Sequence, residues 1–211
     1  MSDLSQWWPV VGLDDVRDQL VAAYADPARG YHDLRHLTEV LERLDELSGA
    51  GAGFDREPVL LAAWFHDAVY AGAADDEELS AQWAERALPD ELDVAEVARL
   101  VRLTALHRPS ATDANGCALS DADLAILAAP AERYDEYAAT LRREYAHVSD
   151  SDFAAGRASI LADLLAKETL FHTSYARDHW EAAARANAGA ELDRLSRGLP
   201  SGGAGPLDEA R

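Results

Sequence analysis

Apolar residues recur at intervals of three and four along most of this 211-residue chain, and alternating apolar and polar stretches are almost absent. The first spacing places apolar side chains on one face of an α-helix, whereas alternation is typical of a β-strand. The pattern therefore predicts an all-α protein. The expected helices cover residues 13–25, 33–48, 56–70, 76–88, 93–107, 121–128, 131–147, 152–167 and 174–197.

Helix breakers and caps separate these segments. The glycine-rich run 49–53 should end the second helix, and Ser151 is expected to cap the eighth. With 48% apolar residues the chain can bury one substantial core, so we expect a single helical domain over residues 1–197. The glycine- and proline-rich segment 198–211 cannot contribute to that core and is expected to be a disordered tail.

The formal charge of −20 argues against binding of a nucleic acid polymer, because affinity for phosphate backbones comes mainly from Lys and Arg. A small phosphorylated molecule remains compatible, since the local field in a cleft outweighs the net charge. The sequence has no uncharged apolar run of eighteen residues and no signal-peptide pattern at its start, so we expect a cytoplasmic protein without a membrane span. Cys117, the only cysteine, excludes an intrachain disulfide and is expected in a loop.

Two histidines and a His-Asp doublet stand out from this helical pattern. His32 and His36 are four residues apart, so on a helix they share one face beside an apolar stripe. His66 and Asp67 directly follow the apolar segment 59–65, which indicates a buried helix. A buried carboxylate without a partner costs several kcal/mol, so Asp67 is expected to bind a cation, and a divalent metal ion would also use His66.

A further ligand should come from another buried helix. Asp123 shares a helical face with Ile126 and Leu127, whereas Asp121 is placed to cap the first turn of that helix. We therefore assign Asp123 to the metal and Asp121 to capping. Each block alone is a weak signal, but the three blocks together are a specific pattern.

The predicted donor set is His36, His66, Asp67 and Asp123. Mixed nitrogen and oxygen ligands suit Mn²⁺, Fe²⁺, Co²⁺, Ni²⁺ or Zn²⁺ better than Ca²⁺ or Mg²⁺. One ion is favoured, and a second ion bridged through Asp67 and water stays open. Such an ion makes hydroxide available near neutral pH and polarises a phosphoryl oxygen, so hydrolysis of a phosphate ester is the expected reaction. His32 and Asp67 are the expected catalytic residues, with His32 as an imidazolium that protonates the leaving oxygen.

These residues resemble the pattern of the HD-domain superfamily of metal-dependent phosphohydrolases: a first histidine, a His-Asp doublet and a later aspartate on a helical core. The resemblance implies the HD-domain fold and the metal ligands His36, His66, Asp67 and Asp123. The block 31–36 is also similar to that of cyclic-nucleotide phosphodiesterases, in which the earlier histidine is the general acid, and this implies that role for His32. Over about residues 30–195 the chain resembles a small bacterial group of HD-superfamily phosphohydrolases, a likeness that specifies the chemistry but no substrate.

Other residues are candidates for substrate binding. His107 continues an apolar helix face and is expected either to point into the same cavity or to end its helix as a structural histidine. Arg35 and Arg142 are candidate phosphate ligands, because a guanidinium pairs with two phosphate oxygens, although Arg142 also fits a solvated helix face. Tyr134, Tyr137 and Tyr145 are candidates for lining a cleft.

Two other functional classes use the same residues. A noncatalytic nucleotide-binding or sensor module would retain the pocket without turnover. An HD-type di-iron oxygenase would need more histidines between residues 68 and 122 than His107 alone. The expected partner is a small phosphorylated substrate, with a nucleotide included, and the apolar helices are compatible with a homodimer without requiring one.

Overall fold

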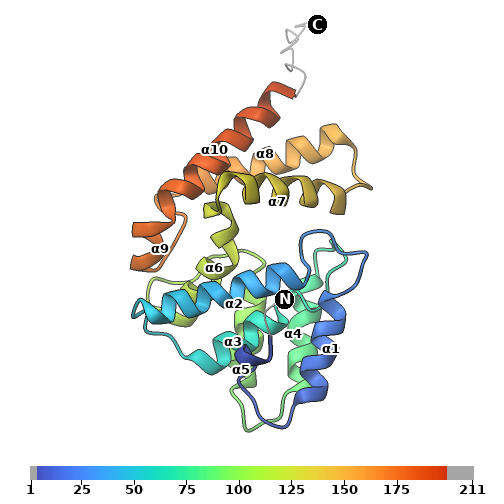
Figure 1. The fold of residues 1–211 in the computed structure, drawn as a ribbon, viewed down its shortest axis with the longest axis vertical. Coiled ribbons are helices and arrows are strands. Elements are labelled where there is room, and N and C mark those ends of the chain that lie inside the picture. Colours follow the sequence, from blue (N-terminus) through green and yellow to red (C-terminus); the bar gives the residue numbers. More distant parts are fainter. Residues whose placement is uncertain (1–3, 199–211) are drawn as a thin grey trace, which may run out of the picture.

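The computed structural model describes residues 4–198 and is helical throughout this range, with no strand (Figure 1). None of the helices in this part of the chain has the length and apolarity needed to cross a membrane. Apart from Gly198, the predicted tail lies outside the described residues. The helices are α1 (Asp14–Tyr24), α2 (Leu34–Gly49), α3 (Arg56–Phe65), α4 (Asp76–Ala87), α5 (Val94–Leu103), α6 (Ala114–Leu124), α7 (Ala131–Glu144), α8 (Asp150–Ala166), α9 (Ser174–His179) and α10 (Glu181–Gly198), with short 3-10 helices at Leu4–Trp7 and Ala125–Ala128.

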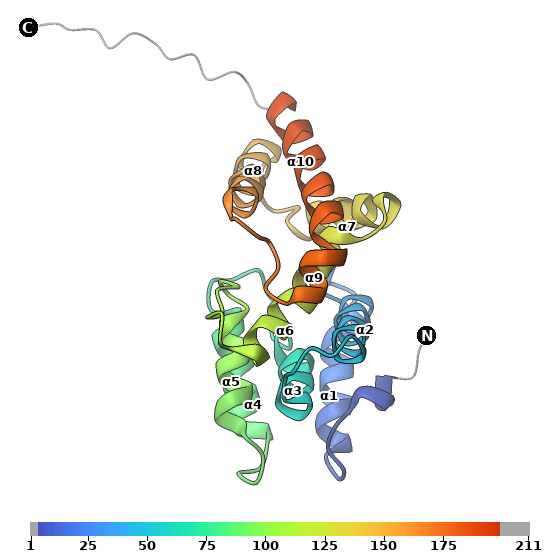
Figure 2. The same ribbon diagram turned by 90° about the vertical axis from the view of Figure 1, so that its left-hand side faces the viewer.

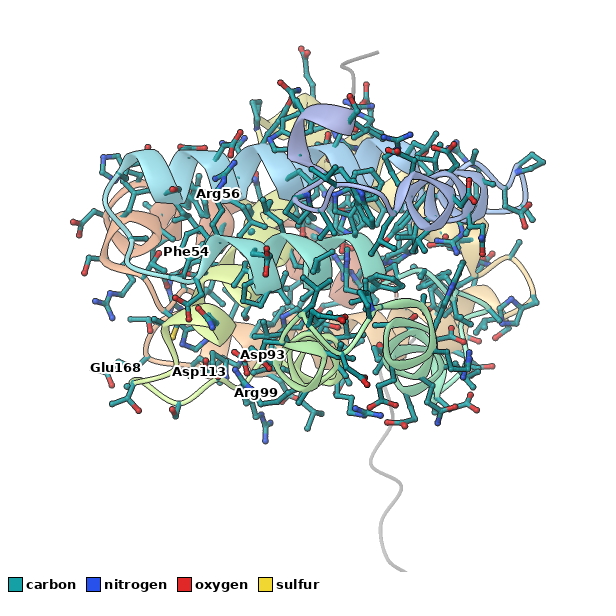
Figure 3. The ribbon with its side chains drawn as sticks, turned by 90° about the horizontal axis from the view of Figure 1, so that it is seen from below. Phe54, Arg56, Asp93, Arg99, Asp113 and Glu168 are labelled. Atoms are coloured by element: carbon teal, nitrogen blue, oxygen red, sulfur yellow. The ribbon has the colours of Figure 1, made fainter. Side chains whose placement is uncertain are left out.

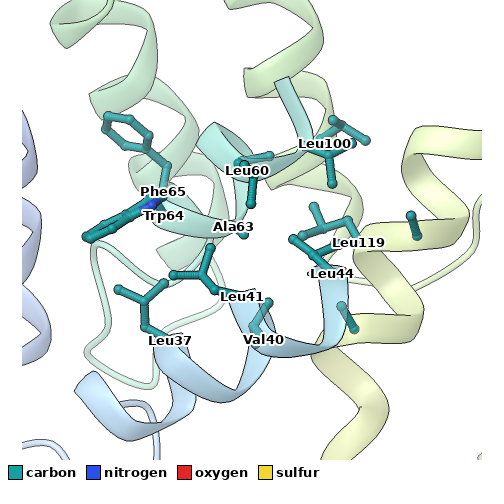
Figure 4. Close-up of a cluster of buried hydrophobic side chains, with 14 of the residues drawn as sticks. Leu37, Val40, Leu41, Leu44, Leu60, Ala63, Trp64, Phe65, Leu100 and Leu119 are labelled. Carbon is teal, nitrogen blue, oxygen red and sulfur yellow. The ribbon is translucent and has the colours of Figure 1, made fainter. Parts of the chain in front are cut away.

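Helix α3 is the buried centre of the fold. All seven residues from Val59 to Phe65 are buried, and α2, α4, α5 and α6 pack against this helix. Figure 4 shows side chains of these helices meeting, among them Leu41 and Leu44 of α2 and Leu119 of α6. Burying each leucine stabilises the fold by about 1.5–3 kcal/mol, so this cluster accounts for much of the driving force for folding. The all-round apolar segment of the sequence is therefore confirmed as a core helix.

The helices form one domain with two groups that α6 connects. Helices α1–α5 form the lower group in Figures 1 and 2, α7, α8 and α10 form the upper group, and α6 runs from one to the other. In the upper group α8 packs along α10, and the 3-10 helix Ala125–Ala128 also packs on α10. Residues of the lower and upper groups thus meet around the end of α6, where Asp123 lies.

Helix α6 begins seven residues earlier than predicted. Its N-cap is Asp113, whose side chain accepts a hydrogen bond from the amide of Gly116 at 2.8 Å. The expectations that Asp121 caps this helix and that Cys117 lies in a loop are therefore wrong, because both residues lie inside α6 and are buried. The low helix propensity of Asn115 and Gly116 is outweighed by the burial of this segment against the core.

Four other boundaries also differ from the sequence expectation. Helix α3 ends at Phe65 and α5 ends at Leu103, so both are shorter than predicted. The last predicted helix is broken at Trp180 into α9 and α10. Ser149, not Ser151, caps α8, and its hydroxyl accepts a hydrogen bond from the amide of Asp152. The early end of α3 places His66 at its C-cap, which orients the His-Asp doublet.

Exposed ion pairs join the start of α6 to α5. Arg99 pairs with Asp113 at 2.7 Å and with Glu96 at 2.7 Å, and Asp93 caps α5 by accepting from the amide of Glu96. Figure 3 labels Asp93, Arg99 and Asp113 at this edge of the molecule. Exposed pairs of this kind stabilise a fold by at most about 1 kcal/mol each, so the buried core remains the main source of stability.

Buried Asp121 anchors α6 to the segment that precedes α9. Its carboxylate is inaccessible to solvent and accepts hydrogen bonds from the amides of His172 at 2.8 Å and Thr173 at 2.7 Å. Replacing Asp121 by Ala leaves the partly buried amides of His172 and Thr173 without an acceptor, so we expect the free energy of unfolding to fall by about 3 kcal/mol. Urea denaturation followed by circular dichroism measures this loss. Asp121→Asn, which retains one acceptor, should fall between wild type and Asp121→Ala, and an unchanged midpoint for Asp121→Ala would contradict the anchoring role.

Candidate metal centre and adjoining cavity

Side chains from three separate helices converge at the centre of the structure. Nε2 of His36, near the start of α2, lies 3.0 Å from Nε2 of His66, at the end of α3. Oδ2 of Asp67 lies 3.2 Å from the first of these nitrogens and 3.1 Å from the second. Oδ1 of Asp123, on α6, lies 3.2 Å from Nε2 of His36 and 3.6 Å from Nε2 of His66. His36, His66 and Asp67 thus form a buried group that could hold a metal ion, and Asp123 lies beside it.

The distances between the ligand atoms and the unpaired oxygen of Asp67 both fit a cation shared by these side chains. Two ligand atoms about 2.1 Å from an octahedral ion, and at right angles to each other, are about 3.0 Å apart, close to most distances in this group. Oδ2 of Asp67 is buried and has no hydrogen-bond partner among the described residues. A buried carboxylate oxygen that faces two imidazole nitrogens is costly unless a cation lies between them. The donor set therefore fits a divalent ion.

Hydrogen bonds on the far side of each imidazole orient the two histidines. Nδ1 of His66 lies 2.8 Å from the carbonyl oxygen of Ala63, and a carbonyl can only accept, so Nδ1 carries the proton. The Nε2 lone pair of neutral His66 is then free to bind a metal. Nδ1 of His36 lies 3.0 Å from the hydroxyl of Tyr31, which can accept its proton in the same way. No sequence motif indicates this role for Tyr31, although it adjoins His32.

Arg29, which the sequence analysis also missed, holds the two ligand-bearing segments together. Its guanidinium donates to the carbonyl oxygens of His32 at 2.9 Å, Asp67 at 2.7 Å and Ala68 at 2.9 Å. The hydroxyl of Tyr24 accepts from the amide of Asp67 at 3.2 Å. These contacts fix the backbone on both sides of the site and keep the ligands near their binding geometry before any ion arrives.

Charge coupling within the group is strong. Burial disfavours protonation of His36, but the carboxylates of Asp123 and Asp67 outweigh burial and raise its pKa to about 9. The pKa of His66 is also raised, because the effect of burial is exceeded by that of Asp67 and other neighbours. Burial favours the neutral form of Asp67 and Asp123, yet the adjacent imidazoles hold the pKa of both carboxyl groups below the usual value. In the absence of a metal, protons on the histidines take the place of the cation.

The metal-free protein should therefore lose stability in alkaline solution. The folded-state pKa of His36, about 9, exceeds its unfolded value of about 6.5, so the stabilising protonation is complete below pH 6.5 and is lost as the pH rises through 9. We expect the free energy of unfolding of chelator-treated protein to be lower at pH 9.5 than at pH 6.5 by on the order of 3 kcal/mol. Urea midpoints at both pH values measure the difference. His36→Gln should reduce it, and equal midpoints for the wild type would contradict the coupling.

His32 lies beside the four candidate ligands His36, His66, Asp67 and Asp123, which we call the metal group, and it contacts α7. Its Nδ1 is 2.8 Å from Oε2 of Glu144, and the ring stacks on Tyr70 with centroids 4.0 Å apart. Oε1 of Glu144 also accepts from the amide of Gly30 at 3.0 Å. Burial opposes ionisation of Glu144, but the hydrogen bond from His32 outweighs it and lowers the pKa of this carboxyl group. Local sequence patterns do not indicate this pair, because its partners are 112 residues apart.

A cavity of about 650 Å³ opens beside these side chains. Its lining includes His32, Asp67, His107 and Asp123, together with Tyr137 of α7. Nε2 of His107 lies 3.5 Å from Oδ2 of Asp123, and its Nδ1 is 3.1 Å from the hydroxyl of Ser120. His107 thus lies beside Asp123 and also in the turn that ends α5, where its φ is +48° and its amide donates to the carbonyl oxygen of Leu103 at 3.0 Å. Burial lowers its pKa, which favours the neutral imidazole.

The two arginines predicted to bind phosphate do not line this cavity. Arg35 is exposed and pairs with Glu39 and Glu136 at 3.1 Å each, on another part of the surface. Arg142 pairs with Asp150 at 2.6 Å and donates to the carbonyl oxygens of Tyr145 and Val148. The structure therefore corrects their assignment: Arg142 holds the connection between α7 and α8, and Arg35 belongs to a surface ion-pair cluster.

Comparison with known proteins adds no relative. No family model matches the chain, and no curated protein or solved structure shows significant similarity to it. The functional interpretation therefore depends on the side-chain arrangement and on the motif resemblance described above.

Proposed function

We propose that the protein is a metal-dependent phosphohydrolase of the HD-domain type, acting on a phosphate ester or anhydride of a small molecule. The observation that carries this proposal is the convergence of His36, His66, Asp67 and Asp123 on one point at the end of a cavity that also contains His32. Buried ligands beside an accessible cavity are what a hydrolytic metal centre requires.

The proposed cofactor is one divalent transition metal ion held by these four side chains. Two imidazoles and two carboxylates suit Mn²⁺, Fe²⁺, Co²⁺, Ni²⁺ or Zn²⁺. When bound, such an ion supplies Lewis acidity, which makes water a nucleophile near neutral pH and polarises a phosphoryl oxygen. Asp67 and Asp123 supply the negative charge that offsets the ion, and Tyr31 and Ala63 keep the two imidazoles turned toward it.

His32 is the proposed proton donor to the leaving group. Glu144 accepts the proton of Nδ1, so Nε2 is the nitrogen left for proton transfer within the cavity. Stacking on Tyr70 restricts rotation of the ring. A positioned imidazolium protonates the departing oxygen as the bond to phosphorus breaks, which stabilises the charge that develops there.

Metal analysis and a substrate panel test this proposal directly. We expect about one transition metal ion per chain after purification, and turnover of p-nitrophenyl phosphate that chelation abolishes and Mn²⁺, Co²⁺ or Ni²⁺ restores. The panel should include bis-p-nitrophenyl phosphate and nucleoside mono- and triphosphates, because the ester class is open. Tight nucleotide binding without turnover under every metal would instead favour the noncatalytic module. A protein that neither retains metal nor hydrolyses any ester would contradict the proposal.

A further inference from the structure

The cavity lining carries more carboxylate groups than one metal ion would bind. Five carboxylate residues line it, and Arg157 is the one arginine or lysine among its described lining residues. The guanidinium of Arg157 is already bound by Glu191 through two contacts, at 2.9 and 3.0 Å, so it offers little positive charge to a ligand. The acidic lining residues are Asp67 and Asp123 of the metal group, together with Asp76, Glu77 and Asp152.

Asp76 carries a buried oxygen without a partner. The residue is 4% exposed, and its Oδ2 accepts from the amides of Ala71 at 2.8 Å and Ala73 at 2.9 Å, which fixes the loop before α4. Its Oδ1 is buried and receives no hydrogen bond from the described residues. A buried acceptor is normally paired, so Asp76 lacks one hydrogen-bond donor.

Glu77 extends the same acidic wall. It is partly buried, lines the cavity and forms no ion pair with the described residues. Burial is the main cause that raises the pKa of Glu77, and the nearby carboxylates of Asp67 and Asp76 raise this pKa further. Two neighbouring carboxylates therefore act on Glu77, and the imidazole of His66 opposes their effect.

Part of the cavity lining is apolar, and we call this part the apolar wall. Tyr137 and Leu141 come from α7, and Phe153 and Ile160 come from α8. A chain of polar or charged groups would lose its hydration along this wall without gaining hydrogen bonds, whereas a hydrocarbon or aromatic spacer would pack against it. The volume of about 650 Å³ has room for such a spacer.

Resting on the proposed phosphohydrolase function, we propose that the substrate is a phosphate monoester whose organic part carries a protonated primary amine. The ammonium group binds between Asp76 and Glu77, and its spacer lies along the apolar wall. An ammonium group provides both the positive charge and the N–H donor that Asp76 and Glu77 lack. A nucleoside triphosphate brings several negative charges to a wall of carboxylates, so it is a poor ligand. Hydrolysis forms a bond from water oxygen to phosphorus, breaks the ester P–O bond and transfers one proton to the leaving oxygen, giving an amino alcohol and inorganic phosphate.

Binding of two matched series of phosphate monoesters tests the amine site. One series is the ω-aminoalkyl phosphates with two to five carbons, and the other is the n-alkyl phosphates in which a methyl group replaces the ammonium. Isothermal titration calorimetry of the Mn²⁺-loaded protein with the phosphonate analogues of both series, whose P–C bond water does not cleave, gives both affinities independently of turnover. At the best chain length we expect the amine to bind at least about tenfold more tightly, as for other hydrogen bonds to charged groups.

Variants test whether the preference for the amine series depends on the carboxylate of Glu77. Glu77→Gln removes one charge with little change in shape and should reduce the preference for the amine to below about threefold. Glu91→Gln, the same change at an exposed position outside the cavity, should leave it unchanged. Equal affinity for both series, or a preference unaffected by Glu77→Gln, would overturn the amine site. A second bound Mn²⁺ that disappears in Glu77→Gln would overturn it too, because the wall would then hold a metal ion.

The two proposals fail in different ways. Turnover of p-nitrophenyl phosphate without any preference for amines would contradict the amine site and leave the phosphohydrolase proposal intact. A clear preference for amines without turnover of any ester would support the amine site and contradict hydrolysis.

Discussion

Replacing Asp67 by Ala should abolish both metal binding and hydrolysis. Oδ2 of Asp67 lies within 3.2 Å of Nε2 of both His36 and His66, so the substitution removes the carboxylate at the centre of the group. Two imidazoles and Asp123 would retain an ion poorly, and we expect metal affinity to fall more than about 100-fold. Turnover should fall at least about a thousandfold, equivalent to about 4 kcal/mol in the activation barrier. Metal content by mass spectrometry and initial rates with p-nitrophenyl phosphate measure the two losses.

A matched control separates this effect from misfolding. Asp90→Ala makes the same chemical change at an exposed position between α4 and α5 and should leave metal content and rate unchanged. Circular dichroism should show the same helix content in both variants. If Asp67→Ala retains stoichiometric metal together with hydrolysis, the assignment of the metal centre is wrong.

The second large effect is expected at His32, and it should depend on the leaving group. His32→Gln preserves a donor for Glu144 but removes the group that would protonate the leaving oxygen. For an alkyl phosphate, whose alkoxide is a poor leaving group, we expect kcat to fall about 100-fold or more. For p-nitrophenyl phosphate, whose phenolate leaves without a proton, the loss should be less than about tenfold. Steady-state rates on both esters measure the contrast.

Metal content distinguishes proton donation from a role as ligand. His32→Gln should retain the ion, since Nδ1 of His32 is engaged by Glu144 and the buried metal group consists of other residues. His179→Gln, on exposed α9 and outside the cavity, is the control and should change neither rate. Equal losses on both esters would contradict general acid catalysis by His32.

Sequence periodicity predicted the helices that carry the site because burial dictates that pattern. The apolar segment 59–65 lies in the core, and the stripe beside His36 faces it, so the positions of His36 and His66 follow from local patterns. The distances between His36, His66 and Asp67 follow from how α2 and α3 pack, which periodicity does not specify.

Other errors came from interactions between distant residues. The segment Asn115–Gly116 resembles a loop in sequence, yet the cap at Asp113 and the burial of the residues from Gly116 onward make it helical, so Asp121 is an interior anchor and not a cap. Arg142 pairs with Asp150 at the start of α8 and donates to two carbonyl oxygens of the α7–α8 connection, and the partners of Arg35 include Glu136 on α7. Long flexible arginine side chains pair with whichever carboxylates the fold places nearby, so their partners cannot be inferred from local sequence.

The anchoring of α6 by the backbone at residues 172 and 173 affects the order in which this protein matures. Asp121 lies two positions before Asp123, but its two amide partners are 51 and 52 residues further along the chain. During synthesis from the N-terminus, helices α1–α5 can fold while these amides are still inside the ribosome. We therefore expect Asp123 to gain its fixed position only after residue 173 has emerged, so that nascent chains acquire their cofactor late.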